Sequence, residues 1–119
     1  MSKQDCSTAR KVRVALDGMG GDYAPAELVS GAARAARELG VEVLITGLKA
    51  DLEAELSKHQ INDSLVKIVE ATEVVKDGEN PIIAAMRKPN SSMAIATKLV
   101  KDGKADAVIS AGSTGTFMV

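Results

Sequence analysis

A strand that runs directly into a glycine-rich turn constrains this chain more than any other feature. The stretch 13–22 reads RVALDGMGGD, and just before and within it Val12, Val14 and Leu16 alternate with other residues, as in a β-strand. Asp17 follows at the carboxyl end of that strand, where ligands bind in open α/β sheets. The glycines after it allow positive φ angles and let a ligand approach the backbone closely. We therefore expect a binding site at this turn.

The turn leads into a helix over residues 25–38. Pro25 suits the first helical position, Glu27 suits the first turn, and Gly40 is a natural end. Free N–H groups at the start of this helix would attract an anion. The apolar stripe expected to face the core has helical spacing and comprises Leu28, Ala32, Ala35, Ala36 and Leu39.

The remainder of the chain repeats the alternation of strands and helices. Strands are expected at 41–47, 66–69 and 105–109, and one helix at 49–58. A further helix is expected to run to about Lys101, with its N-cap supplied by Asn90, Ser91 or Ser92. A short helix at 81–86 and the opening of another at 116–119 are also expected. This order is typical of an α/β fold with three layers, α/β/α, around a mostly parallel sheet.

The composition argues against a nucleic-acid-binding or membrane-spanning protein. The 119 residues carry 15 basic and 16 acidic side chains, a net charge of −1, and only 2% are aromatic, so we expect no nucleic-acid partner. A single cysteine, Cys6, favours a reducing compartment, and no apolar run is long enough to span a membrane. We expect a disordered tail at 1–11. Residues 12–119 are expected to be the N-terminal part of one α/β domain, truncated at its C-terminal end, because the chain stops in an unfinished apolar segment.

A second loop of small residues, Ser110 to Gly115 (SAGSTG), follows the last expected strand. A parallel sheet would bring this loop to the same edge as the first one, where consecutive N–H groups form a nest for phosphate. The dinucleotide fingerprint fails because its third glycine would have to stand at Tyr23, and no P-loop pattern occurs. The loops therefore favour an anion other than NAD or ATP, and tight turns without a ligand are the alternative.

Side chains near the loops are further candidates. Arg87 and Lys88 precede two serines at a helix start and could bind phosphate, or could form a solvated basic turn. Asp17 and Asp22 could bind Mg²⁺, although hydrogen bonds to loop N–H groups are the favoured interpretation. Tyr23 could gate the crevice or pack over the loop.

Three segments in fixed order carry a resemblance to a known family. They are LDGMGGDYAP at 16–25, RKPNSSM at 87–93 and SAGSTG at 110–115. Together they resemble the bacterial phosphate acyltransferase of phospholipid synthesis, the PlsX family, over residues 12–119. Two positions depart from the family pattern: Ser113 stands where Asn is usual, and Asn90 where an acidic residue is common. Both replacements keep a hydrogen-bonding side chain.

The resemblance implies an activity. A fatty acyl group would move from the thioester of acyl carrier protein to inorganic phosphate, giving acyl phosphate, on a fold similar to those of phosphotransacetylases and isocitrate dehydrogenase. We expect no cofactor and no metal, a homodimer, and a cytoplasmic location with peripheral membrane contact through the missing part. The alternatives are a phosphotransacetylase-like enzyme acting on acyl-CoA and a non-catalytic anion-binding α/β module.

The resemblance also suggests roles for the loops. The last loop would contact phosphate or the oxyanion, the first would shape the opposite wall, and 87–92 would bind phosphate or the phosphopantetheine arm. Any general acid is expected beyond Val119, and this chain by itself is expected to be inactive. The candidate substrate-binding set comprises Asp17, Gly20, Gly21, Asp22, Arg87, Lys88, Ser91, Ser92, Ser110, Gly112, Ser113, Thr114 and Gly115.

Overall fold

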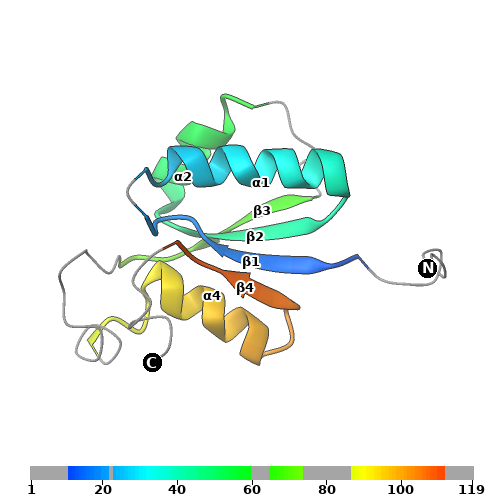
Figure 1. Cartoon of the computed structure of the whole chain (residues 1–119). Helices are drawn as coiled ribbons and strands as arrows, with labels where there is room; N and C mark the ends of the chain where they lie inside the picture. Colours follow the sequence, from blue (N-terminus) through cyan, green and yellow to red (C-terminus); the bar gives the residue numbers. More distant parts are fainter. Residues whose placement is uncertain (1–10, 22, 60–64, 74–86, 112–119) are drawn as a thin grey trace.

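The computed structural model describes residues 11–21, 23–59, 65–73 and 87–111, and all structural statements below concern these (Figure 1). The predicted alternation of strands and helices is confirmed. The helices expected at 81–86 and 116–119, and positions 1–10 of the expected tail, lie outside the described residues. The elements are β1 (Arg13–Asp17), α1 (Ala26–Leu39), β2 (Glu42–Gly47), α2 (Lys49–Leu56), β3 (Val66–Glu70), α4 (Ser92–Lys101) and β4 (Ala107–Ile109).

The sheet has four described strands in the order β3-β2-β1-β4, and every neighbouring pair is parallel. Helices α1 and α2 cover one face and α4 covers the other (Figure 1). This arrangement confirms the three-layer α/β fold. Because β1 pairs on both sides, its carboxyl end lies between the ends of β2 and β4, and the loops after β1 and β4 leave the same edge.

The core has two parts, one on each face of the sheet. The larger one, under α1 and α2, comprises Leu16, Val29, Ala32, Ala36, Val43, Ile45, Leu52 and Val66. The smaller one, under α4, is built on Ala15, Ala96 and Ala105. Successive residues of β1 point to opposite faces, so Ala15 and Leu16 are both buried. The alternation along β1 therefore separates two cores rather than a core from solvent. Of the alternating residues Val12, Val14 and Leu16, Val12, just before the strand, is the exposed one.

The buried stripe of α1 differs from the expected one. The helix buries Val29, Ala32, Ala33 and Ala36, whereas Leu39 is 73% exposed. Leu28 and Ala35 are only partly buried, because the helix turns Val29 and Ala33 inward in their place. The predicted end at Gly40 is confirmed: this residue has a φ of 68° and its N–H donates to the Ala36 carbonyl. Pro25 is the N-cap residue rather than the first helical one.

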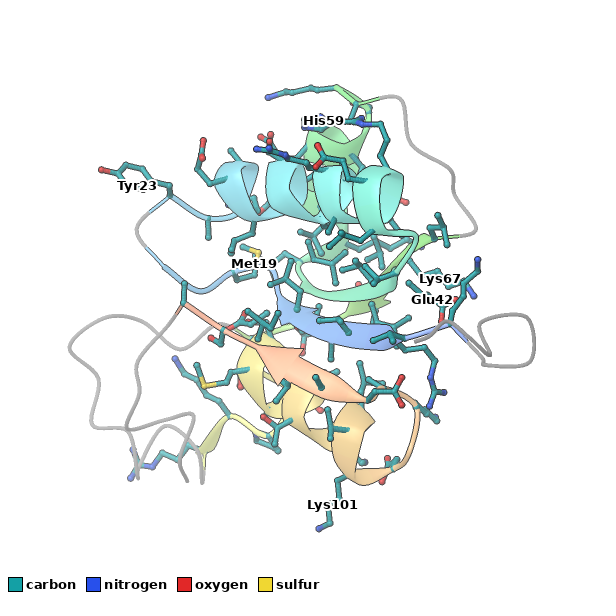
Figure 2. All side chains as sticks on the ribbon, turned by 45° about the vertical axis from the view of Figure 1, so that its right-hand side comes forward. Met19, Tyr23, Glu42, His59, Lys67 and Lys101 are labelled. Carbon is teal, nitrogen blue, oxygen red and sulfur yellow. The ribbon has the colours of Figure 1, made fainter. Side chains whose placement is uncertain are left out.

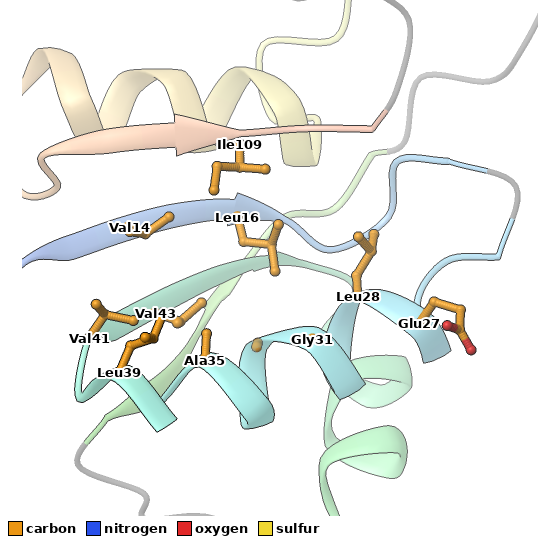
Figure 3. A pocket seen from close by; sticks show the side chains of 11 residues that line it. Val14, Leu16, Glu27, Leu28, Gly31, Ala35, Leu39, Val41, Val43 and Ile109 are labelled. Atoms are coloured by element: carbon orange, nitrogen blue, oxygen red, sulfur yellow. The ribbon is translucent and has the colours of Figure 1, made fainter. Parts of the chain in front are cut away.

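An apolar groove runs beside α1, between this helix and the strands β1 and β4 (Figure 3). Its volume is about 300 Å³. Leu28 and Leu39 line it from the helix, and Val14 and Ile109 line it from the strands. Leu28, Ala35 and Leu39, which were expected in the core stripe of α1, thus line this groove, whereas Ala36 of the same stripe is buried as expected. None of the described helices is long and apolar enough to cross a lipid bilayer.

Candidate functional site

A buried carboxylate stands at the carboxyl end of β1. Asp17, the last residue of the strand, is only 2% exposed. Its Oδ1 accepts hydrogen bonds from the Ser92 hydroxyl at 2.6 Å and from the Met19 N–H at 3.1 Å. Its Oδ2 accepts from the Ser110 hydroxyl at 3.0 Å. The bond from Met19 confirms the favoured interpretation that Asp17 binds a loop N–H group.

The carboxylate gathers residues that are distant in the sequence. Ser92 begins α4, 75 positions after Asp17, and Ser110 follows β4, 93 positions after it. Both serines are in the predicted set, and α4 and β4 bring them to one point at the sheet edge. We call Asp17, Ser92 and Ser110 the aspartate cluster.

The loop after β1 also touches the segment after β4. Gly21 has a φ of 97°, which favours glycine, and a Cβ atom there would lie 3.2 Å from the Cβ of Ala111. Gly20 belongs to the same loop and is partly buried. The loop after β1 and the first two residues after β4 thus lie at one edge of the sheet, the shared edge that the sequence predicts. The other loop candidates, Asp22, Gly112, Ser113, Thr114 and Gly115, lie outside the described residues.

Gly18 has a different role from the one expected of the loop glycines. Its φ is not positive; instead, its N–H donates to the Thr46 carbonyl at 2.7 Å. A Cβ atom at Gly18 would lie 2.7 Å from that oxygen and 2.8 Å from Cγ1 of Ile45. Glycine is therefore required here by packing against β2, and not by the approach of a ligand.

The start of α4 is anchored within the protein. Ser91, one of the three N-cap candidates, is the N-cap residue, and its hydroxyl accepts from the Ala94 N–H at 3.2 Å. The Ser92 N–H donates to the Glu73 carbonyl at 3.1 Å, and Glu73 and Ser91 form a parallel bridge. These N–H groups already have acceptors, so the first turn of α4 contributes fewer free donors to an anion than a bare helix start would.

In the first turn of α1, too, a main-chain N–H group already has an acceptor within the protein. The Glu27 N–H donates to the Tyr23 carbonyl at 3.2 Å. The side chain of Tyr23 is 76% exposed and points away from the glycine loop (Figure 2). The expectation that this ring packs over the loop is wrong, because only the main chain of Tyr23 faces the helix start. Whether Tyr23 gates a crevice stays a prediction.

The basic pair lies in the turn before α4. Arg87 is exposed and Lys88 is partly buried, and the Lys88 carbonyl accepts from the Ser91 N–H at 3.1 Å. Their binding of phosphate stays a prediction.

Thr46 is a contributor that sequence reasoning missed. It is the last residue but one of β2, is fully buried, and its hydroxyl donates to the Ser92 carbonyl at 2.7 Å. The signal was a hydroxyl residue directly after the apolar run 43–45, which must find a partner when buried. Thr46 thus ties β2 to the residue of α4 that holds Asp17.

Comparison with known proteins identifies the relatives of this chain. The model of the family described as "Fatty acid synthesis protein" matches residues 12–119. A phosphate acyltransferase of Desulforamulus reducens is 50% identical over 107 residues, which are 90% of this chain and 32% of that protein. One of Clostridium kluyveri is 47% identical over 105 residues, covering 88% of this chain and 31% of that protein. One of Trichodesmium erythraeum is 46% identical over 106 residues, or 89% and 31% of the two chains.

The chain thus spans about a third of the length of these curated relatives. The match covers both small-residue loops and the aspartate cluster. This chain belongs to the fatty acid synthesis protein family, the family to which the resemblance in its three motifs pointed.

Proposed function

We propose that this sequence is part of an enzyme that transfers a fatty acyl group from the thioester of acyl carrier protein to inorganic phosphate, forming acyl phosphate. The observation that carries the proposal is the meeting of the loops after β1 and β4, with Gly21 against Ala111 and Asp17 bonded to Ser110. The names of the relatives, phosphate acyltransferases, supply the reaction class.

The chemistry asks for positioning rather than for a strong nucleophilic side chain. A phosphate oxygen attacks the thioester carbonyl carbon, the new C–O bond forms, the C–S bond breaks, and the thiol of the carrier leaves. Holding the two reactants in line contributes up to about 7–11 kcal/mol, and one fixed donor to the oxyanion about 3–4 kcal/mol. Main-chain N–H groups of a glycine-rich loop are suitable donors.

We assign these contacts to the loop after β4, at Gly112, Ser113, Thr114 and Gly115. Gly20, Gly21 and Asp22 form the opposite wall. Arg87, Lys88 and Ser91 are assigned to phosphate or to the phosphopantetheine arm of the carrier. We further propose a homodimer in the cytoplasm, in peripheral contact with the inner face of the membrane. The resemblance of the motifs is the support for these last assignments.

The test uses a full-length protein that contains this sequence. It is incubated with phosphate and with either acyl carrier protein thioesters or acyl-CoA, and acyl phosphate is trapped with hydroxylamine. We expect phosphate-dependent product from the carrier thioester. A preference for acyl-CoA would favour the phosphotransacetylase alternative, and the absence of phosphate-dependent product from both donors would leave an anion-binding module.

Gly112→Val tests the assigned loop. A branched side chain would keep the main chain away from the anion, so the KM for phosphate should rise at least tenfold. Gly31→Ala is the matched control, because a Cβ at Gly31 meets nothing within 4 Å. An unchanged phosphate KM in Gly112→Val would refute the assignment.

A further inference from the structure

We propose that Asp17 is a positioning residue, which sets Ser110, where the chain leaves β4, and the start of α4, and which does not itself contact phosphate. The proposal rests on the proposed function and revises it, because Asp17, Ser92 and Ser110 were all candidate phosphate contacts. It assigns to Asp17 the task of holding the segments that frame the site. The two serine hydroxyls are then the links through which Asp17 acts.

Burial and occupancy of the carboxylate are the first argument. The side chain is 2% exposed, and both of its oxygens accept hydrogen bonds from protein groups. The donors come from the loop after β1, from α4 and from the segment after β4. These bonds occupy three of the about four acceptor positions of the carboxylate, and its burial leaves a ligand no direct access, so the carboxylate faces the protein rather than the substrate.

Counting protons gives the second argument. A serine hydroxyl has one hydrogen to donate, and Ser92 and Ser110 both direct theirs to Asp17. Towards any other neighbour they then present only lone pairs. Phosphate at neutral pH is chiefly an acceptor, so these serines do not bind it while Asp17 holds them. The donors to phosphate must instead be main-chain N–H groups or cationic side chains.

The sign of the charge gives the third argument. A carboxylate beside a phosphate anion repels it, and burial strengthens that repulsion. Asp17 is held by three neutral donors, and its charge would oppose phosphate in direct contact. A positioning role explains why an acidic residue stands at the end of this strand without making it a ligand.

The test is a double-variant cycle on Asp17 and Ser110 in a full-length protein that contains this sequence. Asp17→Asn keeps the size of the side chain but cannot accept both hydroxyls, and Ser110→Ala removes one of them. We expect each to lower kcat about tenfold and to change the phosphate KM less than threefold. The double variant should be no more than twofold worse than Asp17→Asn, because both changes remove the same hydrogen bond. Ser110→Thr, which keeps the hydroxyl, should have a kcat close to that of the unchanged protein and above that of Ser110→Ala.

The matched control is Ser57→Ala, which removes an exposed serine hydroxyl bonded to the Ala54 carbonyl at the end of α2. It should leave kcat and KM unchanged. A phosphate KM that rises in Ser110→Ala, together with effects that multiply in the double variant, would show that Ser110 binds phosphate itself and would overturn the proposal.

A second readout does not depend on activity. In Asp17→Asn, hydrogen–deuterium exchange should accelerate in peptides covering the start of α4 and the segment after Ile109, and should stay unchanged in α2. If the wild-type protein forms no acyl phosphate, the proposed function fails, and the exchange data still decide the role of Asp17. Unchanged exchange in both segments would overturn the positioning role even in an active enzyme.

Discussion

The two sides of the end of β1 are built in opposite ways. Towards β2, Gly18 packs against Ile45 and Leu52 so closely that a methyl group has no room. Towards β4, Asp17 is joined to Ser92 and Ser110 by directional hydrogen bonds. The first side fixes where the strand ends, and the second fixes how the neighbouring segments are oriented around that end. Close packing thus supplies the rigid support, and the polar side supplies the shape of the candidate site.

The largest effect is expected on the packed side, from Gly18→Ala. The added Cβ would lie 2.7 Å from the Thr46 carbonyl oxygen, a backbone atom that cannot swing aside. We expect the free energy of unfolding to fall by about 3 kcal/mol, the upper part of the range for overpacking. Urea denaturation measures this.

Gly31→Ala, which adds the same methyl group in open space on α1, is the control and should stabilise the protein by about 0.5–1 kcal/mol. Equal behaviour of the two variants would contradict the view that the β2 side is rigid.

Ser92→Ala should have the next largest effect, on the polar side. It removes a 2.6 Å hydrogen bond to a buried carboxylate, and such bonds to charged groups contribute about 1.5–3 kcal/mol. Ser110→Ala should cost less in the same denaturation measurement, because Ser110 is only partly buried and water can replace its hydroxyl. If Ser110→Ala proves the more costly, the polar side is not organised around α4 as described.

Thr46→Val tests whether the two sides are independent, because Thr46 belongs to β2 and its hydroxyl bonds to Ser92 on the polar side. The change removes the hydrogen bond to the Ser92 carbonyl and leaves the carboxylate and its donors in place. We expect a loss of about 1 kcal/mol in the free energy of unfolding. A loss as large as that of Ser92→Ala would show that the two sides cannot be separated.

The smallest effect is expected far from both sides, at Arg34→Ala on α1. Its ion pair with Glu38, at 2.9 Å, joins exposed side chains one helical turn apart. Such pairs contribute about 0.3–0.5 kcal/mol, and less at high salt. If Arg34→Ala lowered the melting temperature by several degrees, and by the same amount at low and high salt, the pair would have a role beyond that of a surface ion pair.

The sequence predicted what is decided locally. An N-cap within 90–92, the helix end at Gly40 and the order of strands and helices along the chain depend on neighbouring residues, and all are confirmed. The buried face of α1 was predicted in part: Ala32 and Ala36 are buried as expected, whereas Val29 and Ala33 replace Ala35 and Leu39, because the alanines allow more than one stripe with helical spacing.

The candidate site was predictable only in outline. Parallel strands place the two loops at one edge, and that much follows from the fold class. The loop N–H partner of Asp17 was predicted, but its two serine partners could not be, since they lie 75 and 93 positions away and nothing local pairs them with it. Gly18 was assigned to the wrong cause, because a glycine needed for contact and one needed for positive φ look alike in a sequence.

The pairing of β1 on both sides has a consequence for how this chain can vary. Asp17 and Ala15 point towards α4, and Leu16 points towards α1. A shift of the register of β1 by a single residue would exchange these faces. It would place the Asp17 carboxylate in the hydrophobic core beneath α1 and the Leu16 side chain beside Ser92 and Ser110. Any insertion or deletion within this strand would therefore disrupt the packing of the core and the candidate site together. The length of β1 cannot change without affecting both.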